Sequence, residues 1–309
     1  MTETRIVTPR AGSAELNKRG GSARRRSLPL VFLTPAFLVL LAVNAAPVVY
    51  AVVTSLQDYY LPFPAKRAFV GVENYANIFG DPRFWNSFKH TLVYVGVCIT
   101  IQVVLGCFIA VLLSQQKRGV GFIRGVLLLP IVITPIAVAF LWRLMFSPSL
   151  GLLNYLLGLL GLGPFEWIYS PSQALPALIL VDVWQRTPEM VLILFTGLLA
   201  IPDELVEAGK VDGANPWQLF WSIKLPVLKP FLMVGLLFRV IDLAKVFDVI
   251  YILTGGGPGV ATETLSIYTY TTGFSFLRMG YSSALGLLLF ALIVSLALLI
   301  IRWGEVKVD

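Results

Sequence analysis

Hydrophobic residues along this chain gather into long runs that few polar residues interrupt. Six runs are about twenty residues long or longer, and polar or charged segments separate them. Because the hydrocarbon core of a bilayer is about 30 Å thick, a helix rising about 1.5 Å per residue needs about 20 apolar residues to cross it. The pattern therefore predicts an all-α integral membrane protein with six transmembrane helices, at about residues 30–56, 90–113, 123–146, 174–200, 226–252 and 281–301.

Composition supports this class. Of the 309 residues, 57% are hydrophobic and 13% are charged, whereas a soluble domain has about 25% charged residues. This excludes a disordered chain, a collagen and a coiled coil. The first run is too long for a cleaved signal peptide, and no small-residue cleavage site closes it. We therefore expect a multi-pass protein of the cell membrane.

The distribution of basic residues predicts the orientation of the spans. The net charge of +7 would suggest nucleic-acid binding in a soluble protein. However, fifteen Lys and Arg lie before the first span, in or beside the second and fourth links, or after the last span, whereas the other links contain only a few. By the positive-inside rule, both termini are cytoplasmic, and six spans agree with that parity. We predict no nucleic-acid partner, a disordered basic tail over 1–27, a transmembrane domain over 28–302 and a short cytoplasmic end over 303–309. A lipid- or partner-binding role for the tail is a secondary alternative.

The link between the fourth and fifth spans, residues 201–226, has the pattern of two short helices. Asp203 suits the start of the first helix, and Gly213 suits its end. Asn215 and Pro216 can then cap and begin a second helix. Such a patterned link is more than a simple turn.

Small residues on the first of these helices suggest a docking surface. Ala208 and Gly209 leave a smooth patch where another backbone could approach, and Glu207 and Asp212 flank it with charge. The alternative is an amphipathic helix resting on lipid. Because small residues offer little apolar area to lipid, the pattern favours docking to a protein.

The same link resembles the EAA loop of binding-protein-dependent ABC importer permeases. Glu207-Ala208-Gly209, then Gly213 after three residues, then Ile223-Lys224-Leu225-Pro226 after nine more, match the spacing of that motif. Gly209 replaces the usual third Ala and weakens the helix by up to about 1 kcal/mol. The stretches FRVIDLAKVFDVIYILTGGGPGVATETL and TPAFLVLLAVNAAPVVYAVVTSLQDY look like carbohydrate-uptake permeases of the maltose type.

The resemblance implies the type I ABC importer permease fold, with its core at about residues 88–302. It implies a chain without covalent chemistry or cofactor, because ATP and Mg²⁺ bind to a separate ATPase. The implied partners are a second permease subunit in a heterodimer, a pair of ATPase subunits, an extracytoplasmic solute-binding protein and a carbohydrate or related polyol. The residues that it implies for coupling to the ATPase are Glu207, Ala208, Gly209, Asp212 and Gly213.

Ionisable residues inside the predicted spans require an explanation, because inserting each one at mid-bilayer costs about 2.5–3.5 kcal/mol of free energy. In the fourth span, we predict that Asp182 pairs with Arg186 and that Arg186 pairs with Glu189, at spacings of four and three residues. In the fifth span, residues of alternating sign recur every third position. They are Arg239, Asp242, Lys245 and Asp248.

The two charged spans each carry an arginine at the same predicted depth in the membrane. Arg186 and Arg239 each lie about fourteen residues, or about 21 Å, from the cytoplasmic end of their span, so they could border one polar cavity. Planar hydrogen-bonding groups and aromatic faces suit a hydroxyl-rich ligand, and the resemblance also places sugar on these spans. We predict a substrate pathway formed by Trp184, Gln185, Arg186, Glu189, Arg239 and Asp242. The alternative is that these charges pair across helices and hold the bundle together, which we favour for Asp248.

Other motifs add little chemistry. The LTGGGPG segment is predicted to be a turn, and Pro130, Pro135 and Pro188 are predicted to kink their spans. Cys98 and Cys107 fall on opposite helix faces and should not form a disulfide, and His90 is the only histidine. No metal site or phosphate-binding loop is expected. A glycerol-phosphate importer, an ion-coupled secondary transporter and an intramembrane enzyme remain as alternative functions.

Overall fold

The computed structural model describes residues 21–116 and 118–304 of the chain. It contains two compact units, with the boundary between Tyr50 and Ala51. Helix α1 (Gly21–Ser55) makes up the described part of the first unit and ends in the second. Residues 1–20 of the predicted basic tail and 305–309 of the predicted C-terminal end lie outside the described residues, as does Lys117, whereas residues 21–27 of the tail are helical.

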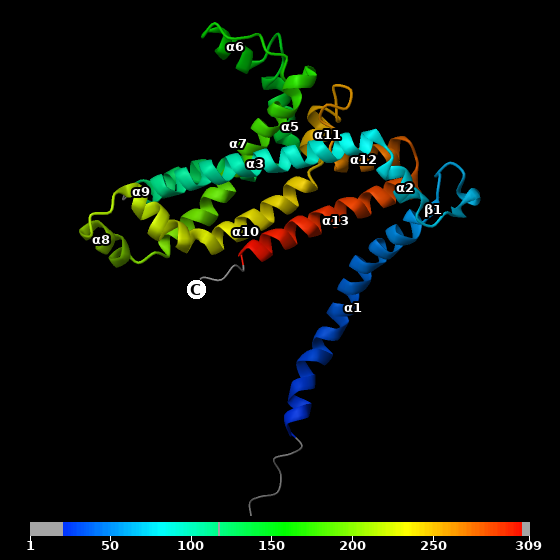
Figure 1. Cartoon of the computed structure of the whole chain (residues 1–309), viewed down its shortest axis with the longest axis horizontal. Coiled ribbons are helices and arrows are strands. Elements are labelled where there is room, and N and C mark those ends of the chain that lie inside the picture. The colour runs from blue at the N-terminus through cyan, green and yellow to red at the C-terminus, as the bar shows by residue number, and fades with distance from the viewer. Residues whose placement is uncertain (1–20, 117, 305–309) are drawn as a thin grey trace, which may run out of the picture. The chain divides into compact units, whose positions relative to one another are not determined.

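Four long helices form the body of the second unit (Figure 1). They are α3 (Pro82–Ser114), α7 (Pro171–Leu199), α10 (Leu225–Ala244) and α13 (Met279–Gly304). Helix α7 packs against both α3 and α10, and α10 also packs against α13. The α7–α10 link lies at one end of these helices, and strand β1 (Gln57–Asp58) lies at the other.

Short elements connect the long helices. Strands β1 and β2 form one antiparallel ribbon in which Gln57 faces Phe69. The short elements are β1 (Gln57–Asp58), η1 (Pro64–Lys66), β2 (Ala68–Phe69), α2 (Glu73–Phe79), α4 (Val120–Val132), α5 (Pro135–Met145), α6 (Leu152–Gly158), η2 (Trp167–Tyr169), α8 (Asp203–Val211), α9 (Pro216–Leu219), the π-helical η3 (Phe220–Lys224), α11 (Asp248–Leu253), α12 (Leu265–Tyr270) and the π-helical η4 (Thr271–Ser275).

Three described helices are long and apolar enough to cross a membrane, namely the Leu33–Ser55 part of α1, α3 and α13. A fourth is possible if α4 and α5, which bend by 92° at their junction, together form one broken span. Helices α7 and α10 occupy the positions of the predicted fourth and fifth spans, but they are less uniformly apolar because each carries charged residues.

Two of the predicted spans are not continuous helices. The third divides before Pro135, which begins α5 as the proline prediction implied, whereas α4 and α7 continue through Pro130 and Pro188. The fifth, predicted over residues 226–252, is interrupted within these bounds. Helix α10 ends at Ala244 and α11 begins at Asp248, where a carboxylate in the first turn is favourable to the helix dipole.

The hydrophobic core lies where α3, α7 and α10 pack against one another, and we call this three-helix contact the seam. Met190 of α7 packs between Gly106 of α3 and Gly235 of α10. A Cβ on Gly106 would lie 2.7 Å from Cγ of Met190, and one on Gly235 would lie 2.9 Å from its Sδ. Because small residues let helices approach closely, this seam brings polar residues of all three helices together.

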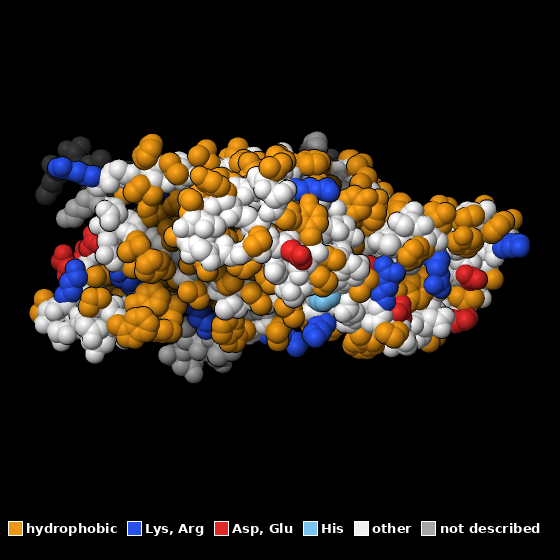
Figure 2. Space-filling view, turned by 90° about the horizontal axis from the view of Figure 1, so that it is seen from above, with side chains coloured by type: hydrophobic (Ala, Val, Ile, Leu, Met, Phe, Trp, Pro, Cys, Tyr) orange, Lys and Arg blue, Asp and Glu red, His pale blue; other side chains and the backbone are white. Residues whose placement is uncertain are grey.

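The outer surface has the character expected of a protein in lipid. Hydrophobic side chains cover much of the middle of the face in Figure 2, and charged side chains gather mainly toward its ends. Large apolar side chains are freely exposed on several helices, among them Phe108 at 62% and Leu144 at 75%. A soluble monomer rarely exposes so much contiguous apolar surface.

Candidate functional site

The link between α7 and α10 folds as the two predicted helices. The first, α8, ends just before Gly213, whose φ of +82° is a conformation that glycine adopts readily. The amides of Gly213 and Ala214 donate to the carbonyls of Lys210 and Gly209, each at 3.0 Å, which closes the helix end. The predicted stop at Gly213 is confirmed.

The second helix begins with a reciprocal cap. Oδ1 of Asn215 accepts from the amide of Gln218 at 2.9 Å, and Oε1 of Gln218 accepts from the amide of Asn215 at 2.8 Å. Helix α9 then passes through the π-helical η3 directly into α10, without a loop. The link is therefore joined rigidly to the helix that carries Arg239.

Gly209 packs inside the link and does not contribute to an outer patch. A Cβ at this position would lie 2.6 Å from Cδ2 of Leu219 and 3.0 Å from Cδ1 of Ile223. The small residue therefore lets α8 lie close to α9 and η3. The predicted coupling residues that are exposed are Glu207, Ala208, Asp212 and Gly213.

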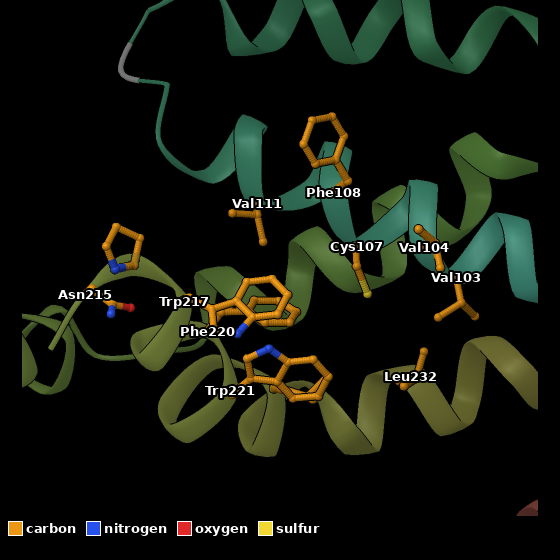
Figure 3. Close-up of a pocket in the computed structure, with 12 residues that line it drawn as sticks. Val103, Val104, Cys107, Phe108, Val111, Asn215, Trp217, Phe220, Trp221 and Leu232 are labelled. Carbon is orange, nitrogen blue, oxygen red and sulfur yellow. The ribbon is translucent and has the colours of Figure 1, made fainter.

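An apolar groove of about 820 Å³ lies between α3 and the second helix of the link (Figure 3). Trp217, Phe220 and Trp221 line one wall, and Phe108 and Val111 of α3 line the other. Tryptophan is enriched where membrane meets water. The second helix therefore presents apolar surface, whereas α8 presents charges.

A buried polar triad crosses the seam of the three helices. Arg239, only 1% exposed, donates from Nη2 to Oδ2 of Asp182 at 2.7 Å and from Nε to Oε1 of Gln102 at 2.9 Å. Nε2 of Gln102 completes the triad by donating to Oδ2 of Asp182 at 2.7 Å. Charges buried in this way need such partners, and the triad supplies them.

The triad corrects one predicted pair. Asp182 forms its ion pair with Arg239 and not with Arg186, because its side chain faces the seam toward α3 and α10. The predicted ion pair between Arg186 and Glu189 is confirmed, although its nearest charged atoms are 3.9 Å apart, which is beyond hydrogen-bond distance.

A polar cavity of about 280 Å³ adjoins the triad. Four of the six residues predicted for the substrate pathway line it, namely Gln185, Arg186, Arg239 and Asp242. Nε2 of Gln185 also donates to the carbonyl of Ile133 at 3.2 Å, where the chain leaves α4. The other lining residues are Pro135, Asp182, Lys245, Val246, Phe247, Asp248 and Val249.

Trp184 and Glu189 do not line this cavity. Trp184 packs edge-on against Trp142 of α5, with ring centroids 5.6 Å apart. Asp248, for which a purely structural role was favoured, does line the cavity because the break after Ala244 turns α11 toward it. Sequence reasoning also missed Gln102, whose only signal was one amide within an apolar run.

The remaining motifs add no reactive centre. LTGGGPG forms the predicted turn, with Gly255, Gly256 and Gly259 at positive φ. Cys98 and Cys107 are both free thiols, as expected. Within the described ranges, no group of His, Cys, Asp and Glu could hold a metal ion.

Comparison with known families decides the identity. Residues 102–306 match the model of the family described as "Binding-protein-dependent transport system inner membrane component". The chain belongs to this family. The permease is 36% identical to the "Trehalose/maltose transport system permease protein MalF" of Thermococcus litoralis, over 93% of the permease and 96% of that protein. It is 39% identical to the "Probable ABC transporter permease protein y4oQ" of Sinorhizobium fredii, over 86% and 88% of the two chains.

The fold comparison agrees with this assignment. The permease superposes on a chain of a bacterial ABC transporter involved in the import of alginate with a TM-score of 0.81, covering 94% of the permease and all of that chain. At 21% identity, this likeness concerns the fold alone. It confirms the ABC importer permease fold.

Family membership also confirms the expected role. The permease is an inner membrane component of a transport system, not an enzyme. Membership of this family argues against two of the alternative functions, an ion-coupled secondary transporter and an intramembrane enzyme.

Proposed function

We propose that the permease is a transmembrane subunit of an ATP-driven importer that carries a neutral carbohydrate or related polyol. The balanced charge of the polar cavity carries this proposal. Its lining contains three acidic and three basic residues. Arg239 is bonded to Asp182, and Lys245 lies 3.0 Å from Asp242. Such a site offers donors and acceptors to hydroxyl groups without a net charge that would select an ion.

Relatives support the carbohydrate class. MalF of Thermococcus litoralis and "Trehalose transport system permease protein SugA" of Mycobacterium tuberculosis, 34% identical, are named for disaccharide transport. UgpA of Pectobacterium atrosepticum, 32% identical, is named for sn-glycerol-3-phosphate transport. A phosphate ligand would call for a cationic site, and the pairing of Arg239 and Lys245 with carboxylates speaks against it.

The assembly proposed for this subunit contains a second permease, two ATPase subunits that bind ATP and Mg²⁺, and an extracytoplasmic solute-binding protein. We place six spans in the membrane, with α4–α5 as one and α10–α11 as another, and both termini in the cytoplasm. Gly304 packs against Met233 of α10, so α13 ends toward the α8–α9 side. This supports a C-terminus on the side where α8 meets the ATPase through Glu207 and its exposed neighbours.

Reconstitution tests the proposal. The complete importer in proteoliposomes should take up a neutral sugar only when ATP and the binding protein are both present. Uptake by the permease alone, driven by an ion gradient, would overturn the proposal. Uptake of sn-glycerol 3-phosphate in preference to all neutral sugars would reject the neutral substrate class.

A further inference from the structure

Four aromatic rings adjoin the polar cavity: Phe247, Tyr251 and Tyr270 contact one another pairwise, and Phe274 stacks on Tyr270. This aromatic row consists of Phe247, Tyr251, Tyr270 and Phe274. Phe247 stacks on Tyr251 with centroids 5.0 Å apart and planes 17° apart, and it lies 4.8 Å from Tyr270. Tyr270 stacks on Phe274 at 5.1 Å and 27°. The row therefore joins α11, α12 and η4 into one surface.

The exposure of the row distinguishes it from a core cluster. Tyr251 is 46% exposed and Phe274 is 64% exposed. By contrast, Phe146, which contacts Trp142 and Trp167 in a comparable group of rings, is fully buried. Packing of the permease's own core does not account for the exposed rings of the row.

The row is continuous with the cavity. Phe247 belongs to both, because it lines the cavity together with Arg186 and Asp242. From there the row extends along α11 and α12, toward the end of the long helices opposite α8 (Figure 1). In the proposed orientation this is the extracytoplasmic end, from which a solute would reach the cavity.

Aromatic rings flanked by polar groups suit a sugar. A pyranose has faces of C–H bonds that lie flat on aromatic rings, and hydroxyl groups at its edge that need hydrogen bonds. Tyr251 and Tyr270 carry both a ring and a hydroxyl group. We propose that the aromatic row is a carbohydrate-binding subsite on the extracytoplasmic side of the cavity, from which the sugar passes to Arg186 and Asp242. This inference rests on the proposed function.

Uptake kinetics of the complete importer in proteoliposomes test the subsite. The probe is the neutral mono- or disaccharide that most raises the melting temperature of the cognate binding protein. Tyr251→Ala and Phe274→Ala should each raise the KM for uptake about fivefold, since a stacked ring contributes about 1 kcal/mol. Tyr251→Phe, which keeps the ring, should stay within twofold of wild type. Phe290→Ala, which removes an equally exposed ring (58%) on α13, is the matched control and should leave KM unchanged.

The outcomes separate two failures. If the wild-type importer moves no neutral sugar, the proposed function falls. If the wild type transports but Tyr251→Ala and Phe274→Ala keep its KM, or if Tyr251→Phe is as impaired as Tyr251→Ala, the aromatic subsite falls alone. Loss of the second permease subunit from the purified Tyr251→Ala or Phe274→Ala complex would make the row a subunit interface and would also overturn the subsite.

Discussion

At the scale of single residues, the triad of Gln102, Asp182 and Arg239 shows how a membrane helix carries a buried cation. Arg239 donates a hydrogen bond to each of its two partners. Asp182→Ala should lower the free energy of unfolding by about 3–5 kcal/mol, because it leaves a buried cation without its carboxylate. Thermal unfolding in detergent measures this loss.

A double substitution provides the control for the triad. Asp182→Leu combined with Arg239→Met should recover much of the stability that Asp182→Ala loses, because replacing a buried pair with apolar groups is often neutral. If the double variant is no more stable than the single one, the loss does not come from an unpaired charge.

Arg186 and Asp242 test the substrate pathway at the same scale. Both line the cavity and neither is fully buried. Alanine at either position should reduce sugar uptake about tenfold or more, in line with the loss of one charge-assisted hydrogen bond of about 1.5–3 kcal/mol. The complex with the ATPase should still assemble, as measured by co-purification. Normal uptake kinetics in both variants would contradict this role.

At the scale of elements, α8 presents a charged surface on a rigid support. Glu207 is exposed, so Glu207→Ala should leave the melting temperature unchanged while it weakens coupling to the ATPase. The measurement is sugar uptake per ATP hydrolysed, which should fall severalfold. Glu204→Ala is the matched control, because Glu204 is an exposed glutamate in the first turn of the same helix. Equal effects of the two substitutions would rule out a specific role for Glu207.

The start of α3 is held by Asp81, which ties three elements together. Its Oδ1 accepts from the amide of Arg83 at 2.8 Å, and its Oδ2 accepts from Tyr281 at 3.0 Å and also from Tyr268. Burial acts to raise the pKa of Asp81, but the hydrogen bonds from Tyr268, Arg83 and Tyr281 outweigh burial, and the pKa is lowered.

A lowered carboxyl pKa makes stability depend on pH. The contribution of Asp81 is complete above the pKa of an unfolded Asp, about 3.9, and is lost as the pH falls through the lower folded pKa. Melting temperatures between pH 6 and pH 3 should therefore fall less steeply for Asp81→Asn than for wild type. Parallel curves would show that ionisation of Asp81 does not stabilise the fold.

At the scale of the whole molecule, the sequence predicted the apolar helices and the two-helix link because each depends on local signals. Run length indicates α3 and α13, and the Gly213 and Asn215 signals indicate the ends of α8 and the start of α9. The break after Ala244 could not be predicted, because no Gly or Pro marks the end of α10 and the charge pattern continues unchanged to Asp248. Gln102 was missed because its partners lie on α7 and α10, and contacts between distant segments leave no pattern in a single sequence.

The helical path from Pro216 to Ala244 is continuous, so a tilt at the link would displace residues farther along the path by larger distances. Arg239 lies about 34 Å along this path from Pro216, at about 1.5 Å per residue. If the path turns as one rod, a tilt of about 5° at the link displaces Arg239 by about 3 Å, a distance comparable to one hydrogen bond. Under that condition, a small angular change at the membrane surface would move Arg239 out of hydrogen-bond distance of Gln102 and Asp182.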